Sequence, residues 1–176
     1  GQLYGEDSID KAKVNAISDF IKTYSRYHQI TAIAEKYTYN NAAGDIMICG
    51  FDSMESRRIY FNKWKIHISK VANNYKQNCL YIDGRLSAET LQVFCIKGDD
   101  EYNINLYENL YLFKSSEADL TICSYKQTTF MANMIGSIIV NLFTNFVANQ
   151  CNPLIDRELP FFTEYSAETM YLNIIK

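Results

Sequence analysis

The segment DIMICGF, residues 45–51, constrains the fold more than any other part of the sequence. It is short and almost wholly apolar, as expected of a strand in a parallel sheet that is covered on both faces. A charged segment with helical character, residues 53–75, follows it directly. A covered strand that leads straight into a helix predicts a layered α/β domain.

The remaining segments extend this pattern. Apolar residues recur at helical spacing at Val14, Ile17, Ile21 and Tyr24, which predicts a helix within residues 8–28. We also expect strands at residues 29–39, 79–85 and 90–98, a long helix at 127–150, and a terminal pair of strands or extended segments at 158–165 and 169–175. Residues 101–113 are ambiguous. The order of these elements predicts an α/β fold with a mostly parallel sheet and flanking helices.

Composition narrows the class of protein. A chain of 176 residues fits one domain, and 48% hydrophobic residues suffice for a core. The net charge of −3 argues against a protein that binds the phosphate backbone of nucleic acid. Three asparagines interrupt the apolar stretch 130–149, which therefore predicts a buried or half-buried helix of a soluble protein rather than a membrane span.

Cysteine usage predicts a reducing compartment. The five cysteines are odd in number and form no C-x-x-C pair, so a structural zinc site is not expected. Cys49 and Cys95 lie inside apolar runs and are interpreted as buried thiols. No signal peptide begins the sequence, and we expect a cytoplasmic protein.

Asp52 stands between the apolar strand and the following helix, and two interpretations of it remain open. With Glu55 three residues later, it matches a helix N-cap and capping box, which is the favoured interpretation on spacing alone. However, ligands of open α/β sheets bind outside the carboxyl ends of the strands, where Asp52 is expected to lie. The two roles can coexist, since a cap would orient the carboxylate at the sheet edge.

Nearby cationic and nucleophilic residues are candidates for chemistry. Arg57 and Arg58, one turn into the predicted helix, are more often solvated surface charges. Lys13 lies near a helix start, where the macrodipole disfavours a cation, so an anion could compensate it. Cys123 precedes the long helix, where a thiol can become nucleophilic, although a buried hydrophobic role is the more common one.

Four segments, in this order, resemble the ThiF/MoeB superfamily of ubiquitin-activating-type adenylyltransferases, in particular its bacterial and phage members. These segments are residues 1–21, 43–64, 80–94 and 122–143. The resemblance covers residues 2–150 and corresponds to the latter two-thirds of such a domain. It implies a Rossmann-like, ThiF-type fold in a single domain over residues 1–176, incomplete at its N-terminal side because the first βαβ unit and its Gly-rich phosphate loop are absent from this chain.

The resemblance also implies roles for five residues. Gln2 matches a glutamine of the nucleotide site, and Lys13 falls on the lysine that contacts the phosphates of ATP. Asp52 and Arg57 match an Asp-x-x-x-x-Arg pattern, whose aspartate serves Mg–ATP and the adenylation step. Cys123 lies where many members carry an acceptor cysteine. Within the matching segment IDGR, Asp83 and Arg85 have no role assigned by the resemblance.

The implied reaction is the ATP- and Mg²⁺-dependent adenylation of a C-terminal carboxylate on a ubiquitin-like protein or peptide. The carboxylate is already ionised, so alignment and charge neutralisation matter more than acid–base catalysis. The expected partners are that acceptor, an N-terminal half or partner subunit carrying the phosphate loop, and a second subunit in a homo- or hetero-oligomer. Neither nucleic acid nor a membrane is expected. The alternative is a non-catalytic ThiF-like interaction or structural module in a larger assembly.

Overall fold

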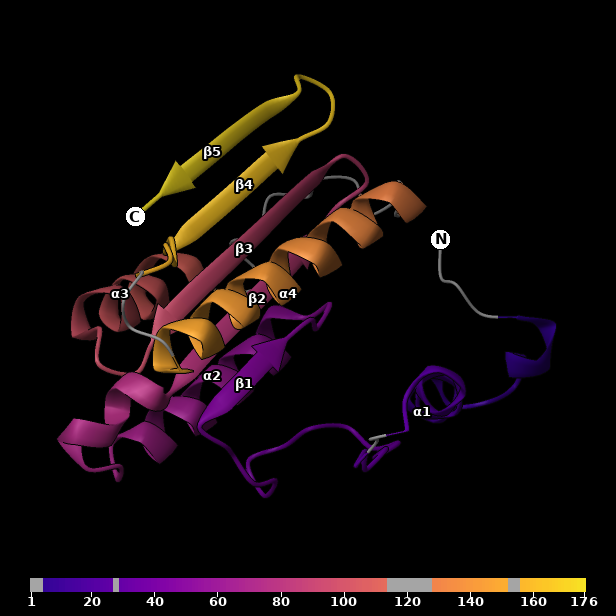
Figure 1. Ribbon diagram of the computed structural model, residues 1–176, viewed down its shortest axis with the longest axis horizontal. Coiled ribbons are helices and arrows are strands. Elements are labelled where there is room, and N and C mark those ends of the chain that lie inside the picture. The colour runs from indigo at the N-terminus through magenta and orange to yellow at the C-terminus, as the bar shows by residue number, and fades with distance from the viewer. Residues whose placement is uncertain (1–4, 27–28, 114–127, 152–155) are drawn as a thin grey trace. The chain divides into compact units, whose positions relative to one another are not determined.

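The computed structural model describes residues 5–26, 29–113, 128–151 and 156–176 (Figure 1). The chain divides into two compact units, Gln2–Tyr37 and Thr38–Lys176, which are described separately. The smaller unit holds a short 3₁₀ turn, η1 (Glu6–Ser8), and helix α1 (Lys13–Tyr24). The predicted helix within residues 8–28 is thus confirmed, although it begins five residues later than the pattern suggested.

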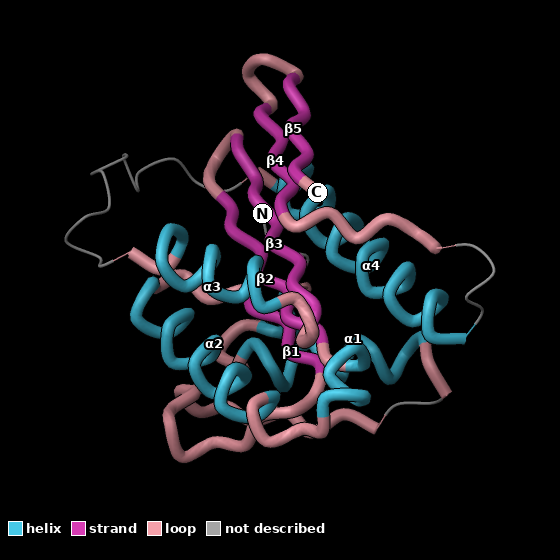
Figure 2. The backbone as a smooth tube through the Cα atoms, turned by 90° about the vertical axis from the view of Figure 1, so that its left-hand side faces the viewer, coloured by secondary structure: helices cyan, strands magenta, loops and turns pink. Residues whose placement is uncertain are grey.

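The larger unit is a five-stranded sheet with helices on both faces. Its elements are β1 (Ile46–Cys49), α2 (Met54–Ile68), η2 (Asn73–Asn78), β2 (Leu80–Leu86), β3 (Thr90–Lys97), α3 (Glu101–Leu106), η3 (Tyr107–Tyr111), α4 (Thr129–Cys151), β4 (Phe162–Ser166) and β5 (Tyr171–Ile175). Figure 2 shows α2 and α3 on one side of the sheet and α4 on the other. The α/β class, the strands around 45–51, 79–85 and 90–98, and the terminal pair of strands are confirmed.

The prediction of a mostly parallel sheet is wrong for the described strands. The strand order is β1-β2-β3-β4-β5, and only β1 and β2 are parallel, whereas the other three pairings are antiparallel. For two of these three pairings, β2 with β3 and β4 with β5, the cause lies in the connections. Residues 87–89 join β2 to β3 and residues 167–170 join β4 to β5, and a parallel connection needs a dozen residues or more. The connection through α2 is long enough, and it produces the parallel pair.

The predicted strand at residues 29–39 is also wrong. These residues form no regular element and are mostly exposed. A strand requires a partner ladder, and no described strand pairs with this segment. The ambiguous segment 101–113 proves to be helical, with α3 continued by the π-helical turn η3.

Strand β2 carries the core of the larger unit because its side chains alternate between the two faces of the sheet. Leu80 and Ile82 join a buried cluster with Met131 and Ile135 of α4. On the opposite face, Tyr81 packs among the aromatic rings of α2 and η3, namely Phe61, Trp64 and Tyr107. Both faces are therefore covered over the length of β2, in keeping with its nearly continuous burial.

Helix α4 is half-buried, as its interrupted apolar sequence predicted. Among the described helices it is the one long and apolar enough to cross a membrane by length and composition, with a mean hydropathy of 1.5 over its most apolar window. Four residues on one face nevertheless pack on the sheet and are buried: Met131, Ile135, Leu142 and Phe146. The opposite face, including Val140, is exposed. The helix thus packs as one layer of the α/β unit.

Gly98, in the turn between β3 and α3, offers a test of this packing. A Cβ atom there would lie 2.6 Å from the Cβ of Cys79 and 2.6 Å from the carbonyl oxygen of Lys76. We expect Gly98→Ala to lower the free energy of unfolding by about 1–3 kcal/mol, because the backbone of η2 would have to shift. Urea denaturation measures this loss.

The matched control is Gly136→Ala in α4, where nothing lies within 4 Å of the added carbon. Alanine is favoured over glycine in a helix interior by roughly 0.5–1 kcal/mol, so this variant should be at least as stable as the parent. Equal stability of the two variants would contradict the close approach of the Gly98 turn to η2.

Candidate functional site

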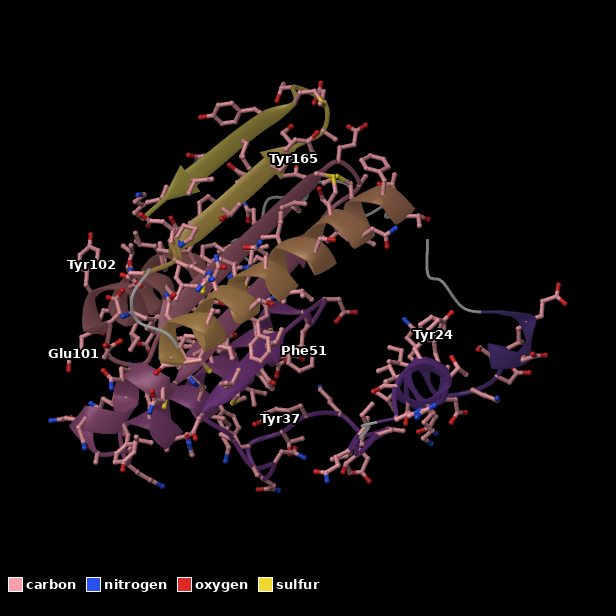
Figure 3. All side chains as sticks on the ribbon, in the orientation of Figure 1. Tyr24, Tyr37, Phe51, Glu101, Tyr102 and Tyr165 are labelled. Atoms are coloured by element: carbon pink, nitrogen blue, oxygen red, sulfur yellow. The ribbon has the colours of Figure 1, made fainter. Side chains whose placement is uncertain are left out.

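The carboxyl ends of the two parallel strands bring the candidate residues of the larger unit together. Cys49, the last residue of β1, is the register partner of Asp83 on β2. Gly50, Phe51 and Asp52 follow β1 and lead into α2. Figure 3 shows Phe51 where β1 ends. The loop that carries Asp52 therefore begins beside Asp83, the central residue of β2.

Ser53, and not Asp52, caps helix α2. The Ser53 hydroxyl oxygen accepts a hydrogen bond from the backbone N–H of Ser56 at 3.1 Å, and the two serine hydroxyls lie 2.8 Å apart. The interpretation of Asp52 and Glu55 as an N-cap and capping box is therefore wrong by one position. Serine is as good a cap as aspartate, and Ser53 has the extended backbone that the cap position requires.

As a result, the Asp52 carboxylate is not used by the helix. Asp52 is exposed, and its side chain makes no hydrogen bond or ion pair with the residues described. It lies just before the N-terminus of a helix of 15 residues, at the carboxyl end of the parallel strand pair. An exposed carboxylate at this position is accessible from solvent.

Arg57 is buried, contrary to the expectation that it would be a solvated surface charge. Its guanidinium group pairs with the fully buried carboxylate of Asp83 and donates to the carbonyl oxygens of Phe51 and of Gly84, the latter at 3.2 Å. Arg57 therefore pairs with Asp83, and not with the Asp52 of the Asp-x-x-x-x-Arg pattern. Through this contact Arg57 fixes the peptide directly before Asp52.

Arg85 is the second cation on the same carboxylate. Its Nε atom lies 2.7 Å from Oδ2 of Asp83, and its guanidinium group lies over the ring of Phe94, 4.6 Å from the centroid. It also donates to the carbonyl oxygen of Tyr111 at 2.9 Å. The Tyr107 hydroxyl donates to Oδ2 of Asp83 at 2.8 Å. The Asp83 carboxylate thus accepts from two guanidinium groups and one phenol.

We name Arg57, Asp83, Arg85 and Tyr107 the Asp83 cluster. It contains two fixed positive charges and one carboxylate, so its net charge is positive inside the fold. Burial, and then the negative charge of Asp83, raises the pKa of Tyr107 well above its usual range, so the phenol remains a donor. The cluster is therefore a set of three hydrogen-bond donors, two guanidinium groups and one phenol, around one acceptor carboxylate.

Arg58 extends this arrangement to the end of η3. Its Nε atom donates to the carbonyl oxygen of Leu112 at 3.0 Å, next to the Tyr111 carbonyl that Arg85 holds. Arg58 is thus half-buried and structural, so the expectation of a solvated charge is wrong here too. Together, the three arginines link the β1–α2 loop, the end of η3 and the middle of β2.

The other predicted site residues belong to the smaller unit or lie outside the described residues. Lys13 is exposed and is the first residue of α1, in the smaller unit. Its helix has no side-chain cap at Ala12 and no acidic residue in its first turn. Gln2 and Cys123 lie outside the described residues. Within the described part of the chain, no group of three or more metal-ligating side chains occurs.

Sequence reasoning noticed Asp83 and Arg85 without a role, and it missed Tyr107. The available signal was two charged residues at alternate positions of an otherwise apolar strand, which places both on one face. An unpaired buried charge is costly, so such a strand predicts that the two charged groups are paired inside the fold. Tyr107 lay in the segment whose structure the sequence left ambiguous.

A hollow of about 540 Å³ lies at the opposite end of the sheet, around Lys97. Lys97 is the register partner of Leu80, at the start of β2, so the hollow is remote from Asp52. Two of its lining charges, Lys97 and Asp99, pair with each other at 3.5 Å. This hollow therefore does not contribute to the Asp52 site.

Two comparisons with known proteins give no match: no protein-family model matches the chain, and no curated protein sequence does. The candidate site is therefore defined by its geometry, with Asp52 exposed and the Asp83 cluster buried behind it.

The contacts of the Asp83 cluster predict that a nearly isosteric substitution of Asp83 lowers the stability of the fold strongly. Asp83→Asn keeps the shape but leaves two buried guanidinium groups without a counter-charge. We expect a loss of about 3–5 kcal/mol in the free energy of unfolding, measured by urea denaturation. Asp99→Asn, which breaks a half-exposed pair with Lys97, should cost about 1 kcal/mol or less. Similar losses in both variants would contradict the central role of Asp83.

The buried thiols predict a loss of stability in alkali. Burial raises the pKa of Cys95 to about 12, and burial together with the charge of Asp83 raises that of Cys49 to about 12. Above about pH 9 the unfolded chain releases thiol protons that the folded chain keeps, so rising pH favours unfolding between about pH 9 and pH 12. Each thiol contributes a slope of at most about 1.4 kcal/mol per pH unit.

Urea denaturation between pH 8 and pH 10 measures this dependence. Cys95→Ala removes one titrating group and should reduce the slope, whatever it does to absolute stability. A slope unchanged by the substitution would mean that the Cys95 thiol does not contribute to the dependence.

Proposed function

We propose that this chain is part of an ATP-dependent adenylyltransferase of the ThiF type. It activates the C-terminal carboxylate of a ubiquitin-like protein or peptide as an acyl-adenylate. One observation carries the proposal: the Asp52 carboxylate is exposed and unpaired among the described residues, at the carboxyl end of the parallel strand pair, on a loop that Arg57 fixes. Ligands of open α/β sheets bind at this edge.

Magnesium fits this assignment. Mg²⁺ retains several waters and is held by one or two carboxylates together with the phosphates of the substrate, so a protein cage of several ligands is not required. A single accessible carboxylate suffices, and Asp52 is such a group, on a loop whose Phe51 carbonyl is held by Arg57. Bound there, Mg²⁺ would neutralise phosphate charge.

In the reaction, the acceptor carboxylate attacks the α-phosphorus of ATP and pyrophosphate leaves. We assign to Asp52 the binding of the metal, and to Lys13 a point charge on the phosphates. Arg57 acts by positioning, since its guanidinium group is already engaged by Asp83 and the Phe51 carbonyl. Gln2 is assigned to the nucleotide and Cys123 to acyl transfer. The Gly-rich phosphate loop would come from an upstream segment or a partner subunit.

A second candidate function is a non-catalytic interaction module with the same fold. The exposed apolar side chains of the two edge strands favour it, for example Ile48 on β1 and Leu172 on β5. Such a module would not bind nucleotide. Saturating Mg–ATP stabilises a nucleotide-binding protein by about 2.7 kcal/mol at one hundred times the Kd, whereas it leaves the interaction module unchanged.

Asp52→Ala tests the enzymatic proposal. With the full-length protein, Mg–ATP and its carboxylate acceptor, we expect ATP–pyrophosphate exchange to fall by about 100-fold or more, because a group that organises the phosphates is removed. The free energy of unfolding should change by less than about 0.5 kcal/mol, since Asp52 is exposed and caps no helix.

Glu55→Ala is the matched control, an exposed carboxylate one turn further along the chain. It should keep the exchange rate of the parent. Undiminished exchange in Asp52→Ala, or equal losses in the two variants, would exclude the assigned role of Asp52.

A further inference from the structure

Strand β5 (Tyr171–Ile175) forms an outer edge of the sheet, with β4 on one side and no described strand on the other. Four of its five side chains are large, apolar and 43–59% exposed: Tyr171, Leu172, Ile174 and Ile175. Successive side chains of a strand point to opposite faces, so both faces of β5 are apolar and uncovered. In Figures 1 and 2 the turn of the β4–β5 hairpin points away from α2, α3 and α4.

Such an edge is normally protected. Exposed edge strands carry a row of unpaired backbone N–H and C=O groups, and proteins protect them with lysine, proline or a β-bulge. Residues 169–175, TMYLNII, contain no charge and no proline. Lys176, the residue after β5, forms an ion pair with Glu158, with 2.7 Å between the two charged groups. The backbone and side chains of β5 are thus both suited to a further strand.

The sequence of β5 is symmetric in character about its central residue. Two large apolar residues precede Asn173 and two follow it. When two copies of such a strand pair antiparallel, the residue at the centre meets itself across a two-fold axis. Tyr171 then faces Ile175 of the second copy, and Leu172 faces Ile174. Every cross-strand pair except the central one is apolar.

We propose that β5 pairs antiparallel with β5 of a second copy of this chain, about a two-fold axis at Asn173, and joins two sheets into one. The symmetric pattern favours a second copy over an unrelated partner, because the same strand supplies complementary residues on both sides of the axis. Apolar cross-strand pairs, including aromatic with β-branched ones, stabilise sheets, and a polar residue at one central position fixes the register. The proposal does not depend on the adenylyltransferase assignment.

A charge-swap experiment at Asn173 tests the axis directly. Sedimentation velocity of the full chain from about 10 µM to about 1 mM should show a reversible dimer, as expected of a small interface. Asn173→Lys and Asn173→Asp each place like charges opposite one another at the axis, and each should weaken the dimer by about tenfold or more. An equimolar mixture of the two variants should restore dimerisation, because the opposite charges then meet.

Rescue by mixing also guards against misfolding, since a misfolded variant could not be restored by its counterpart. Circular dichroism of each variant adds a direct check, because Asn173 lies opposite Glu164 on β4. Asn40→Lys and Asn40→Asp, the same changes at an exposed loop residue, should leave the dimer unchanged. A parent chain that is monomeric at all concentrations, or a mixture that fails to dimerise, would overturn the proposal.

Discussion

The buried carboxylate of Asp83 is the interaction on which the larger unit depends. It has no contact with water, and it accepts from Arg57, Arg85 and the hydroxyl of Tyr107. Burying these charges is costly, and the arrangement is tolerable only because the acceptor and the donors are supplied together. Since the donors come from α2, β2 and η3, one charged group specifies how three elements meet.

The arginines around Asp83 also contact the backbone near the candidate site. Arg57 binds the carbonyl oxygen of Phe51, while Arg85 and Arg58 bind those of Tyr111 and Leu112. Carbonyl oxygens inside a fold need donors, and here cationic side chains provide them. The β1–α2 loop is therefore held by the buried side chain of Arg57. The Asp52 carboxylate is exposed and, among the described residues, makes no contact that stabilises the loop.

The contrast between Asp52 and Asp83 also indicates what the sequence could reveal. Apolar runs and helical spacing located α1, α2, α4 and most strands, because local burial determines those patterns. The prediction of parallel strand pairing was wrong, because the direction of pairing depends on the length of connections such as the three residues between β2 and β3, and not on the apolar content of the strands. The ion pair between Arg57 and Asp83 was not predicted for a related reason, since the two residues are in contact but 26 positions apart in the sequence.

The topology of the sheet has a kinetic consequence. The β2–β3 and β4–β5 pairs are hairpins between neighbours in the chain, whereas the β3–β4 pair joins Phe94 to Phe162, with α3, η3 and α4 in the intervening chain. Closing a long loop costs entropy before its contacts form, so pairings between distant segments slow folding. We therefore expect each hairpin to form early. The pairing of β3 with β4, which joins the two hairpins, should then limit the rate at which the sheet forms.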